Sequence, residues 1–196
     1  MILKYIKQYS ESFENKEIKK VVIGVPAHFN NLQREDTIKA AEEAGLEVIK
    51  LINEPTAAAI AYGDIIKSDK ERNVLIFDLD WGTFDVSIVK IKDKEYNVLA
   101  SIGEEHLGGE DFNQRLIDYV ISEIKKKKEF KDMNFENRNE KRIMNALKRL
   151  NTKAELVKLE LSSQKKASFF IDTLNGDNDL NLEITRSKHE LLCIDL

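Results

Sequence analysis

The chain contains very little cysteine or proline, and both scarcities exclude classes of protein. Its 196 residues include one cysteine, Cys193, which cannot form an intramolecular disulfide and is typical of a reducing compartment. Two prolines and a charged fraction of 34% argue against a linker-rich or low-complexity chain. A chain of this length can bury a hydrophobic core as one large domain or as two small ones.

Long hydrophobic runs and an excess of positive charge are missing as well. No apolar run approaches the roughly 20 residues of a membrane-spanning helix. Residues 1–20 also lack the apolar core and small-residue cleavage site of a secretory signal. The formal net charge is −4, with both signs mixed along the chain, which is not the pattern of a nucleic-acid or membrane-surface protein. We therefore expect a cytoplasmic protein without nucleic-acid or membrane partners.

Hydrophobic periodicity predicts an α/β chain. Apolar residues at spacings of three and four predict helices at residues 2–14, 31–45, 54–63, 112–124, 143–161 and 187–196. Short apolar or alternating runs predict strands at residues 21–25, 46–52, 74–77, 84–89, 96–102, 167–174 and 180–185. The apolar seam of the helix at 143–161 is narrow, and we expect it to pack against the helix that precedes it. Residues 64–72 are predicted to form a charged surface connection.

The segment at residues 73–89, NVLIFDLDWGTFDVSIV, carries the clearest chemical signal. It predicts a β-hairpin whose turn lies between two aspartates, Asp78 and Asp85. The turn also contains Gly82 and Thr83, and this combination suits a hydrated cation and a phosphate oxygen. Strand ends collect aspartate, glycine and threonine for the sake of the turn alone, so the residues by themselves leave both interpretations open.

The hairpin resembles the second phosphate loop of the seventy-kilodalton heat-shock chaperones of the DnaK type, the heat shock protein 70 family within the actin-like ATPases. Three further segments resemble this family in order and spacing: residues 25–30 (VPAHFN), 52–63 (INEPTAAAIAYG) and 106–112 (HLGGEDF). The resemblance implies a partial actin-like ATPase (ribonuclease H-like) fold. Such a fold would combine a mixed sheet and helices with a smaller α+β subdomain.

The resemblance covers almost the whole chain but only about half of an ATPase domain. It implies three segments: residues 1–63 as the second half of the lower first-lobe subdomain, 64–107 as the start of the second-lobe sheet with the phosphate-loop hairpin, and 108–196 as the outer helical and hairpin subdomain. In the family, further first-lobe residues come before this stretch, and the remaining second lobe and the peptide-binding domain come after it. We therefore expect a truncated chain without a peptide-binding domain.

The resemblance also implies a site for ATP or ADP with Mg²⁺. Asp78 matches the aspartate that holds Mg²⁺ through water molecules, and Thr83 matches the threonine that contacts the γ-phosphate. Asp85 and Glu54 match the remaining carboxylates around the metal and the attacking water. The implied catalytic residues are thus Asp78, Thr83, Asp85 and Glu54, of which the three carboxylates are the implied metal ligands.

A second group of residues matches the positions that surround the nucleotide in the family. Lys158 and Glu155 match a clamp on the adenosine, and Ser162 matches a hydroxyl contact. Leu159 stands where the family has an arginine that stacks on the adenine, so the cation–π contact and the guanidinium hydrogen bonds are lost. The nucleotide-contacting residues implied are Gly82, Thr83, Gly108, Gly109, Glu155, Lys158 and Ser162.

The phosphate loop departs from the family pattern at two positions, where Asp80 and Trp81 replace glycines. Glycine lets backbone N–H groups approach phosphate closely, and Trp81 adds bulk there. The carboxylate of Asp80 adds a charge that repels phosphate by about 4 kcal/mol at ~4 Å and an effective dielectric constant near 20, as an upper estimate. A loss of that size corresponds to roughly a thousandfold in affinity. We expect weak or absent hydrolysis.

Three functional hypotheses follow. The first is a divergent chaperone ATPase domain, in which ATP binding and slow hydrolysis are coupled to protein folding. The second is a non-hydrolytic interaction protein: Lys50 and Asn53 lie where the family meets J-domain co-chaperones, and the helical subdomain lies where nucleotide-exchange factors dock. The third is a non-functional product of a partial gene.

The histidines and the cysteine suggest no additional chemistry. His28, His106 and His189 are too far apart in sequence for a zinc motif. His28 replaces the family's tyrosine after Pro-Ala, and we interpret it as structural. For Cys193 we favour a buried thiol over a catalytic nucleophile.

Overall fold

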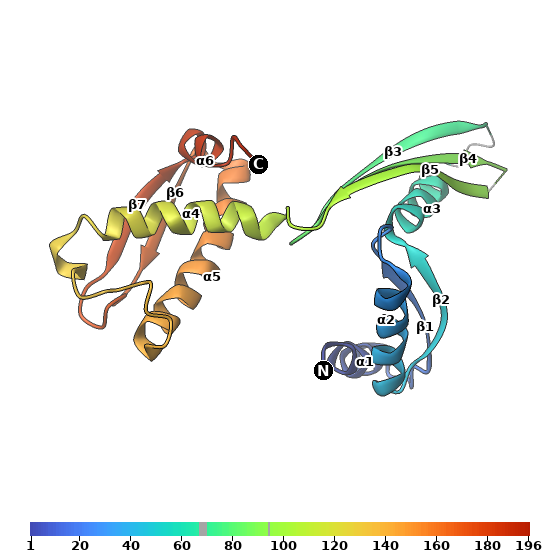
Figure 1. Cartoon of the computed structure of the whole chain (residues 1–196), viewed down its shortest axis with the longest axis horizontal. Coiled ribbons are helices and arrows are strands. Elements are labelled where there is room, and N and C mark those ends of the chain that lie inside the picture. The colour runs from blue at the N-terminus through green and yellow to red at the C-terminus, as the bar shows by residue number, and fades with distance from the viewer. Residues whose placement is uncertain (67–69, 94) are drawn as a thin grey trace. The chain divides into compact units, whose positions relative to one another are not determined.

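The chain forms two compact units. The computed structural model describes residues 1–66, 70–93 and 95–196, and Figure 1 shows the path of the chain through them. The first unit contains residues 1–79 and 83–105, and the second contains residues 80–82 and 106–196. The three family segments expected from the sequence stay a prediction, because a division by compactness does not test their correspondence to family subdomains.

The first half of the first unit is a parallel pair of strands with its crossover helix. Its elements are α1 (Ile2–Glu14), β1 (Lys20–Val25), α2 (Asn31–Glu43) and β2 (Glu47–Asn53). Helix α2 begins with a capping box, in which the Asn30 side chain accepts the Gln33 N–H and the Gln33 side chain accepts the Asn30 N–H. Helix α2 packs on β2 and α1 packs on α2, so this half follows the predicted order of elements.

The second half of the first unit is an antiparallel sheet of three strands in the order β3–β4–β5. Its elements are α3 (Glu54–Ile66), β3 (Arg72–Leu79), β4 (Phe84–Lys92) and β5 (Glu95–Glu104). Helix α3 lies against this sheet (Figure 1) and also contacts β1 and β2. The buried apolar cluster between α3 and the sheet is small and consists of Ala59, Val89 and Ile91. The predicted hairpin at 73–89 is confirmed.

Helix α3 does not end at Gly63, where the sequence predicted its end, but continues to Ile66. A Cβ atom on residue 63 would lie 2.5 Å from the Tyr96 hydroxyl of β5. Gly63 therefore allows the close approach of helix and sheet, which is a tertiary reason for glycine that a local sequence pattern does not reveal. The predicted connection at 64–72 is correspondingly shorter, and its residues 67–69 lie outside the described residues.

The second unit has the larger hydrophobic core. Its elements are α4 (Gly109–Ile124), a short 3₁₀ helix (Lys128–Phe130), α5 (Lys141–Ser163), β6 (Lys166–Ile171), β7 (Leu180–Thr185) and α6 (Arg186–Leu192). Helix α5 packs against α4 and against β6, which pairs with β7 as an antiparallel hairpin. The prediction that α5 packs on the preceding helix is confirmed. Fully buried side chains of this core include Leu116, Ile124, Phe130, Ile143, Leu150, Val157, Phe169 and Leu180.

The last helix is shorter than the sequence predicted. Helix α6 begins at Arg186 and ends at Leu192 rather than at Leu196. The Thr185 hydroxyl caps its start by accepting the Lys188 N–H at 3.1 Å. At Cys193 the backbone leaves the helical region, with φ −110° and ψ 8°, while its N–H still bonds to carbonyls of the last turn. The helix therefore stops in a tight turn.

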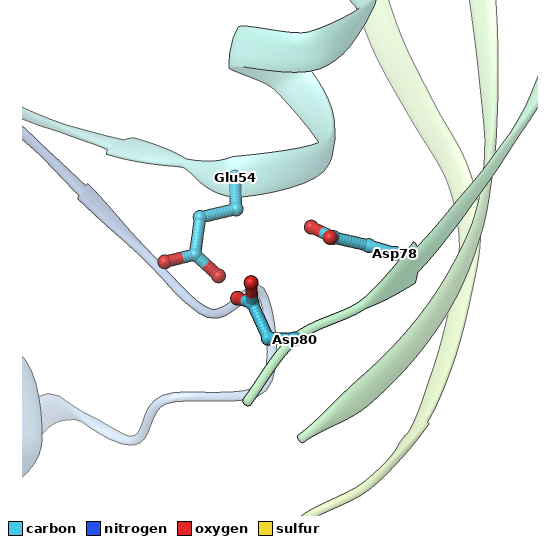
Figure 2. Close-up of side chains that lie close together, drawn as sticks. All are labelled: Glu54, Asp78 and Asp80. Atoms are coloured by element: carbon cyan, nitrogen blue, oxygen red, sulfur yellow. The ribbon is translucent and has the colours of Figure 1, made fainter. Parts of the chain in front are cut away.

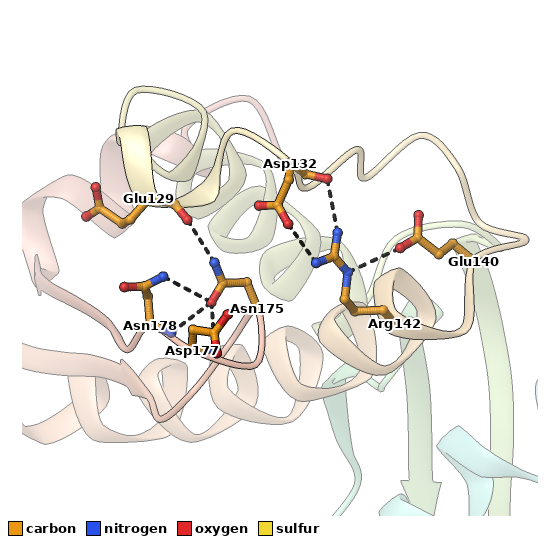
Figure 3. Close-up of polar contacts among 7 residues, drawn as sticks. All are labelled: Glu129, Asp132, Glu140, Arg142, Asn175, Asp177 and Asn178. Atoms are coloured by element: carbon orange, nitrogen blue, oxygen red, sulfur yellow. Dashed lines mark hydrogen bonds and ion pairs between the residues drawn. The ribbon is translucent and has the colours of Figure 1, made fainter.

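Polar contacts fix the long connection between α4 and α5 (Figure 3). Arg142 donates to the Asp132 carboxylate at 2.7 Å, to the Asp132 carbonyl at 3.1 Å and to Glu140 at 3.1 Å. Asn175 donates to the Glu129 carbonyl at 2.8 Å, and its own oxygen accepts two backbone N–H groups of the β6–β7 turn. These bonds tie the connection to both α5 and the hairpin.

The architecture is the expected α/β class. Within residues 1–66, 70–93 and 95–196, the parallel pair and the antiparallel strands lie in three separate sheets of two, three and two strands. Within the parts of the chain that the structure describes, no helix has both the length and the apolar character needed to cross a membrane.

Candidate functional site

Two predicted metal ligands, Glu54 and Asp78, lie together in the first unit. Glu54 is the first residue of α3 and follows β2 directly, while Asp78 is the penultimate residue of β3. Their carboxylate oxygens are within 4.8 Å of each other, and both side chains are half-buried. In Figure 2 the Asp78 side chain points from β3 toward the start of α3, from which Glu54 projects. Hard oxygen ligands at this spacing suit a divalent cation such as Mg²⁺.

Asp85, the third predicted ligand, lies directly opposite Asp78 in the β3–β4 register. Opposed residues of an antiparallel pair share one face of the sheet, so the two side chains are neighbours. Asp85 is only 4% exposed, and its Oδ1 lies 3.1 Å from Nδ1 of His28 in the loop after β1. The first unit therefore gathers the predicted carboxylates Glu54, Asp78 and Asp85 around one end of the hairpin.

Residues 80–82 of the predicted phosphate loop belong to the second unit and cap the first helix of that unit. The Asp80 carbonyl accepts the Gly109 N–H, and the Trp81 carbonyl accepts the Glu110 N–H, each at 2.8 Å. These N–H groups belong to the first turn of α4, where a helix has no partners of its own for them. Asp80, which Figure 2 also labels, is exposed, and Trp81 is 69% exposed. Thr83 is half-buried and returns the chain to the first unit.

Gly108 and Gly82 lie in close backbone contact. A Cβ atom on residue 108 would overlap the backbone of Gly82 and Trp81, so no larger residue fits there without a shift. A Cβ atom on residue 82, in contrast, would meet no atom within 4 Å. The loop is thus pressed against the start of α4 on one side and open at Gly82. This arrangement fits a phosphate-binding loop, because phosphate oxygens have to come close to the backbone there.

One predicted clamp residue of α5, Lys158, contacts Gly109 of the predicted glycine pair. Lys158 donates to the Gly109 carbonyl at 2.9 Å and forms an ion pair with Glu155 at 2.8 Å. Glu155 also accepts the Asn113 amide at 2.7 Å. The bonds from Lys158 and then Asn113 hold the pKa of Glu155 below its usual value. The hydroxyl of Ser162 is exposed and bonds to the Lys158 carbonyl at 3.3 Å within α5 itself.

Two residues of these clusters, Asn113 and His28, are not among the site residues predicted from the sequence. Asn113 is 2% exposed, and its Oδ1 is buried without a hydrogen-bond partner in the described structure. His28 contacts Asp85 although 57 positions separate them. A polar residue on the buried face of α4 is the one signal that could have marked Asn113, whereas no local pattern marks His28.

Comparisons with known proteins agree on one family. A family profile described as "Hsp70 protein" matches residues 1–196. The chain is 45% identical to "Heat shock 70 kDa protein" from Emericella nidulans and 45% identical to the protein of the same name from Neurospora crassa. It is 43% identical to "Chaperone protein DnaK" from Buchnera aphidicola. Each alignment covers 100% of this chain but only 29%, 29% and 30% of the respective relative.

Proposed function

The chain belongs to the Hsp70 family, and from that premise we propose that it binds ATP or ADP with Mg²⁺ as part of the ATPase region of a protein-folding chaperone. The family's actin-like ATPase fold agrees with the α/β architecture. The chain spans less than a third of the length of its relatives. ATP hydrolysis, coupling to protein folding and a cytoplasmic location are therefore proposals for this chain.

The carboxylates of the first unit fit the metal. Glu54, Asp78 and Asp85 would hold Mg²⁺, largely through water, because Mg²⁺ keeps several waters and prefers oxygen ligands. The bound ion would neutralise charge on the phosphates. The fit rests on the carboxylates' own positions: Glu54 and Asp78 have oxygens within 4.8 Å, and Asp85 opposes Asp78.

The second unit fits the phosphate and nucleoside parts of the ligand. The single observation that carries the proposal is the backbone contact between Gly108 and Gly82, with open space at Gly82. Gly82, Gly108 and Gly109 would meet the phosphates, together with the Thr83 hydroxyl. Glu155, Lys158 and Ser162 would contact the nucleoside.

We propose that Asp80 and Trp81 weaken this binding. Both side chains are exposed in the loop that would surround the phosphates. The carboxylate of Asp80 would oppose the phosphates by up to about 4 kcal/mol at an effective dielectric constant near 20. Slow or absent hydrolysis would follow from poor binding.

The test is a calorimetric titration of the natural chain and of the Asp80→Gly/Trp81→Gly variant with Mg-ATP and Mg-ADP. We expect weak binding by the natural chain and binding up to roughly a thousandfold tighter by the variant. Asp93→Gly is the matched control, since Asp93 is an exposed turn aspartate with φ 48° between β4 and β5. It should leave the affinity unchanged.

Two outcomes would contradict the proposal. Tight saturable binding by the natural chain would overturn the weakening effect of the loop. Failure of both the natural chain and the loop variant to bind, while circular dichroism shows them folded, would overturn nucleotide binding by this chain.

A second candidate function is the binding of a J-domain co-chaperone or an exchange factor without hydrolysis. Lys50 and Asn53 line one groove of about 360 Å³ together with Thr56, Ile60 and Tyr96. This shared groove favours a docking role for the two residues. Titration with a J-domain protein tests it: a complex that forms without nucleotide and is lost in Lys50→Glu would support the role, and binding that ignores Lys50→Glu would oppose it.

A further inference from the structure

We propose that His28 is a positioning residue for the Asp85 carboxylate, which it holds in the orientation that the metal site needs. The inference rests on the proposed function, because Asp85 is one of the three carboxylates assigned to Mg²⁺. The sequence alone suggested only a structural role for His28. The structure adds a specific polar contact between the imidazole and a buried carboxylate.

The contact has the geometry of a directed hydrogen bond. Nδ1 of His28 lies 3.1 Å from Oδ1 of Asp85. We infer that Nδ1 is the donor of this hydrogen bond, because carboxylate oxygens serve as acceptors. Asp85 is 4% exposed, and a buried carboxylate requires a donor because it has lost its water shell. His28 supplies that donor from outside the sheet.

Two further side chains, Glu105 and Phe29, border the imidazole. Its Nε2 faces the Glu105 carboxylate at 3.6 Å, and its ring edge packs on Phe29 with the ring centroids 6.1 Å apart. The Glu105 side chain is 60% exposed, whereas that of His28 is 25% exposed. The ring therefore spans from an outer carboxylate to the buried one. This arrangement limits the directions from which Nδ1 can donate.

Gly103 of β5 leaves free the space that the same carboxylate occupies. Asp85 pairs with Gly103 in the β4–β5 register, and a Cβ atom on residue 103 would overlap Oδ1 of Asp85. The same Cβ would lie 2.9 Å from the Phe84 carbonyl oxygen. The Asp85 carboxylate thus occupies the space above a residue that has no side chain. It is held between Gly103 and the imidazole of His28.

A carboxylate fixed in this way is preorganised, so it does not have to reorient when a metal ion binds. Residues that orient metal ligands affect metal affinity by about 10- to 100-fold when they are removed. Asp85 directly opposes Asp78. A rotation of the Asp85 side chain would therefore change how the two carboxylates are arranged relative to each other at the proposed metal site. His28 would therefore act through Asp85, without touching the ion.

The first test measures the hydrogen bond between His28 and Asp85 by NMR, without any nucleotide. The chain has three histidines, His28, His106 and His189, so imidazole ¹⁵N signals can be assigned by single substitutions. We expect His28 to be the Nδ1–H tautomer, and we expect Asp85→Ala to shift its signals while those of His106 stay in place. An Nε2–H tautomer that does not respond to Asp85→Ala would overturn the inference.

The second test compares two substitutions of His28 by titration with Mg-ATP, in the Asp80→Gly/Trp81→Gly background. His28→Asn keeps an N–H donor close to the position of Nδ1, whereas His28→Leu removes it. We expect His28→Leu to bind about 10- to 100-fold more weakly and His28→Asn to stay within about threefold of the parent. Gly103→Ala, which crowds the carboxylate from β5, should also weaken binding.

The outcomes separate the inference from the proposed function. Equal affinity of His28→Leu, His28→Asn and the parent would overturn the inference and leave nucleotide binding standing. Absence of binding by every variant would overturn the proposed function and the metal-positioning role of His28 together. The tautomer measurement would then report whether the hydrogen bond itself exists. Circular dichroism identifies any variant that does not fold.

Discussion

The two units differ sharply in how well they bury their apolar side chains. The core of the second unit runs through α4, α5 and the β6–β7 hairpin and contains fully buried side chains such as Leu150 and Phe169. The buried cluster between α3 and the sheet of the first unit comprises Ala59, Val89 and Ile91. Large apolar side chains that are more than half exposed in the first unit include Ile2, Tyr5, Tyr9, Phe13, Leu75 and Phe77.

This difference indicates where the stability of the chain resides. Burial of apolar area is the main favourable contribution to folding, at about 25 cal/mol per Å². The second unit obtains that contribution from its own elements. The first unit places its polar site residues on elements whose other faces remain exposed. The proposed metal ligands therefore lie in the part of the chain with less packing of its own.

Two adjacent phenylalanines of β6 give the strongest test of the core of the second unit. Phe169 is 0% exposed and Phe170 is 46% exposed. We expect Phe169→Ala to lower the free energy of unfolding of the second unit by about 3–5 kcal/mol, because it leaves a cavity. Phe170→Ala should cost less than about 1 kcal/mol. Urea unfolding followed by circular dichroism measures both, and equal losses would contradict the described core.

Amide hydrogen exchange compares the two units directly. We expect the Leu150 amide in α5 to exchange at least about tenfold more slowly than the Val89 amide in β4, which corresponds to about 1.4 kcal/mol of opening free energy. Both residues are 0% exposed, so a difference in side-chain exposure would not account for a difference between their exchange rates. Equal protection at the two positions would show that the first unit is as stable as the second.

Low pH should lower the free energy of unfolding of the second unit through protonation of His189. Burial, as the largest effect, lowers the pKa of His189 below its ordinary value of about 6.5, opposed in part by a hydrogen bond with the Phe112 backbone. Below pH 6.5 the unfolded chain binds a proton that the folded unit binds less readily. The stabilisation is therefore complete above pH 6.5 and is lost as the pH falls toward the lowered pKa.

The free energy of unfolding should change with pH by at most about 1.4 kcal/mol per pH unit, which is the value for the binding of one proton. Urea unfolding between pH 7.5 and pH 5 measures it. His189→Phe should remove this part of the pH dependence. His106→Gln, which changes an exposed histidine of the same unit, should preserve it. A profile unchanged by His189→Phe would assign the acid sensitivity to other groups.

The smallest effect is expected at the connection between α4 and α5. Arg142 forms exposed ion pairs with Asp132 and Glu140, and such pairs contribute little in water. We expect Arg142→Ala to change the free energy of unfolding only slightly, because solvent screens both ion pairs. Thermal unfolding compared with Lys126→Ala, which breaks another exposed pair, provides the check. A loss comparable to that of Phe169→Ala would mean that the connection supports the core.

Local patterns in the sequence were sufficient for most elements. The alternating run at residues 84–89 and the seam of α5 each predicted the correct element, because hydrophobic period and burial agree there. Gly63 was misread as a helix end, since its role is to admit Tyr96 from β5. The same limit applies to the contact between His28 and Asp85. Such pairings depend on the fold and leave no trace in neighbouring residues.

The predicted site was recovered unevenly for the same reason. The proximity of Glu54 to Asp78 and of Lys158 to Gly109 agrees with positions that the family resemblance proposed. Their roles toward a nucleotide stay a prediction. The tight backbone contact of Gly108 with Gly82 could not be derived from spacing, because it depends on how the loop meets α4.

The interleaved path of the chain limits how its gene can be rearranged. Residues 80–82 lie inside the hairpin of the first unit in sequence, yet the carbonyls of Asp80 and Trp81 accept the first N–H groups of α4. A recombination breakpoint after Glu105 would transfer α4, α5 and the β6–β7 hairpin without the acceptors for that helix start. A gene rearrangement can therefore keep or duplicate the two units together. A single crossover in the gene cannot exchange one unit alone, because residues 80–82 of the second unit lie between residues of the first.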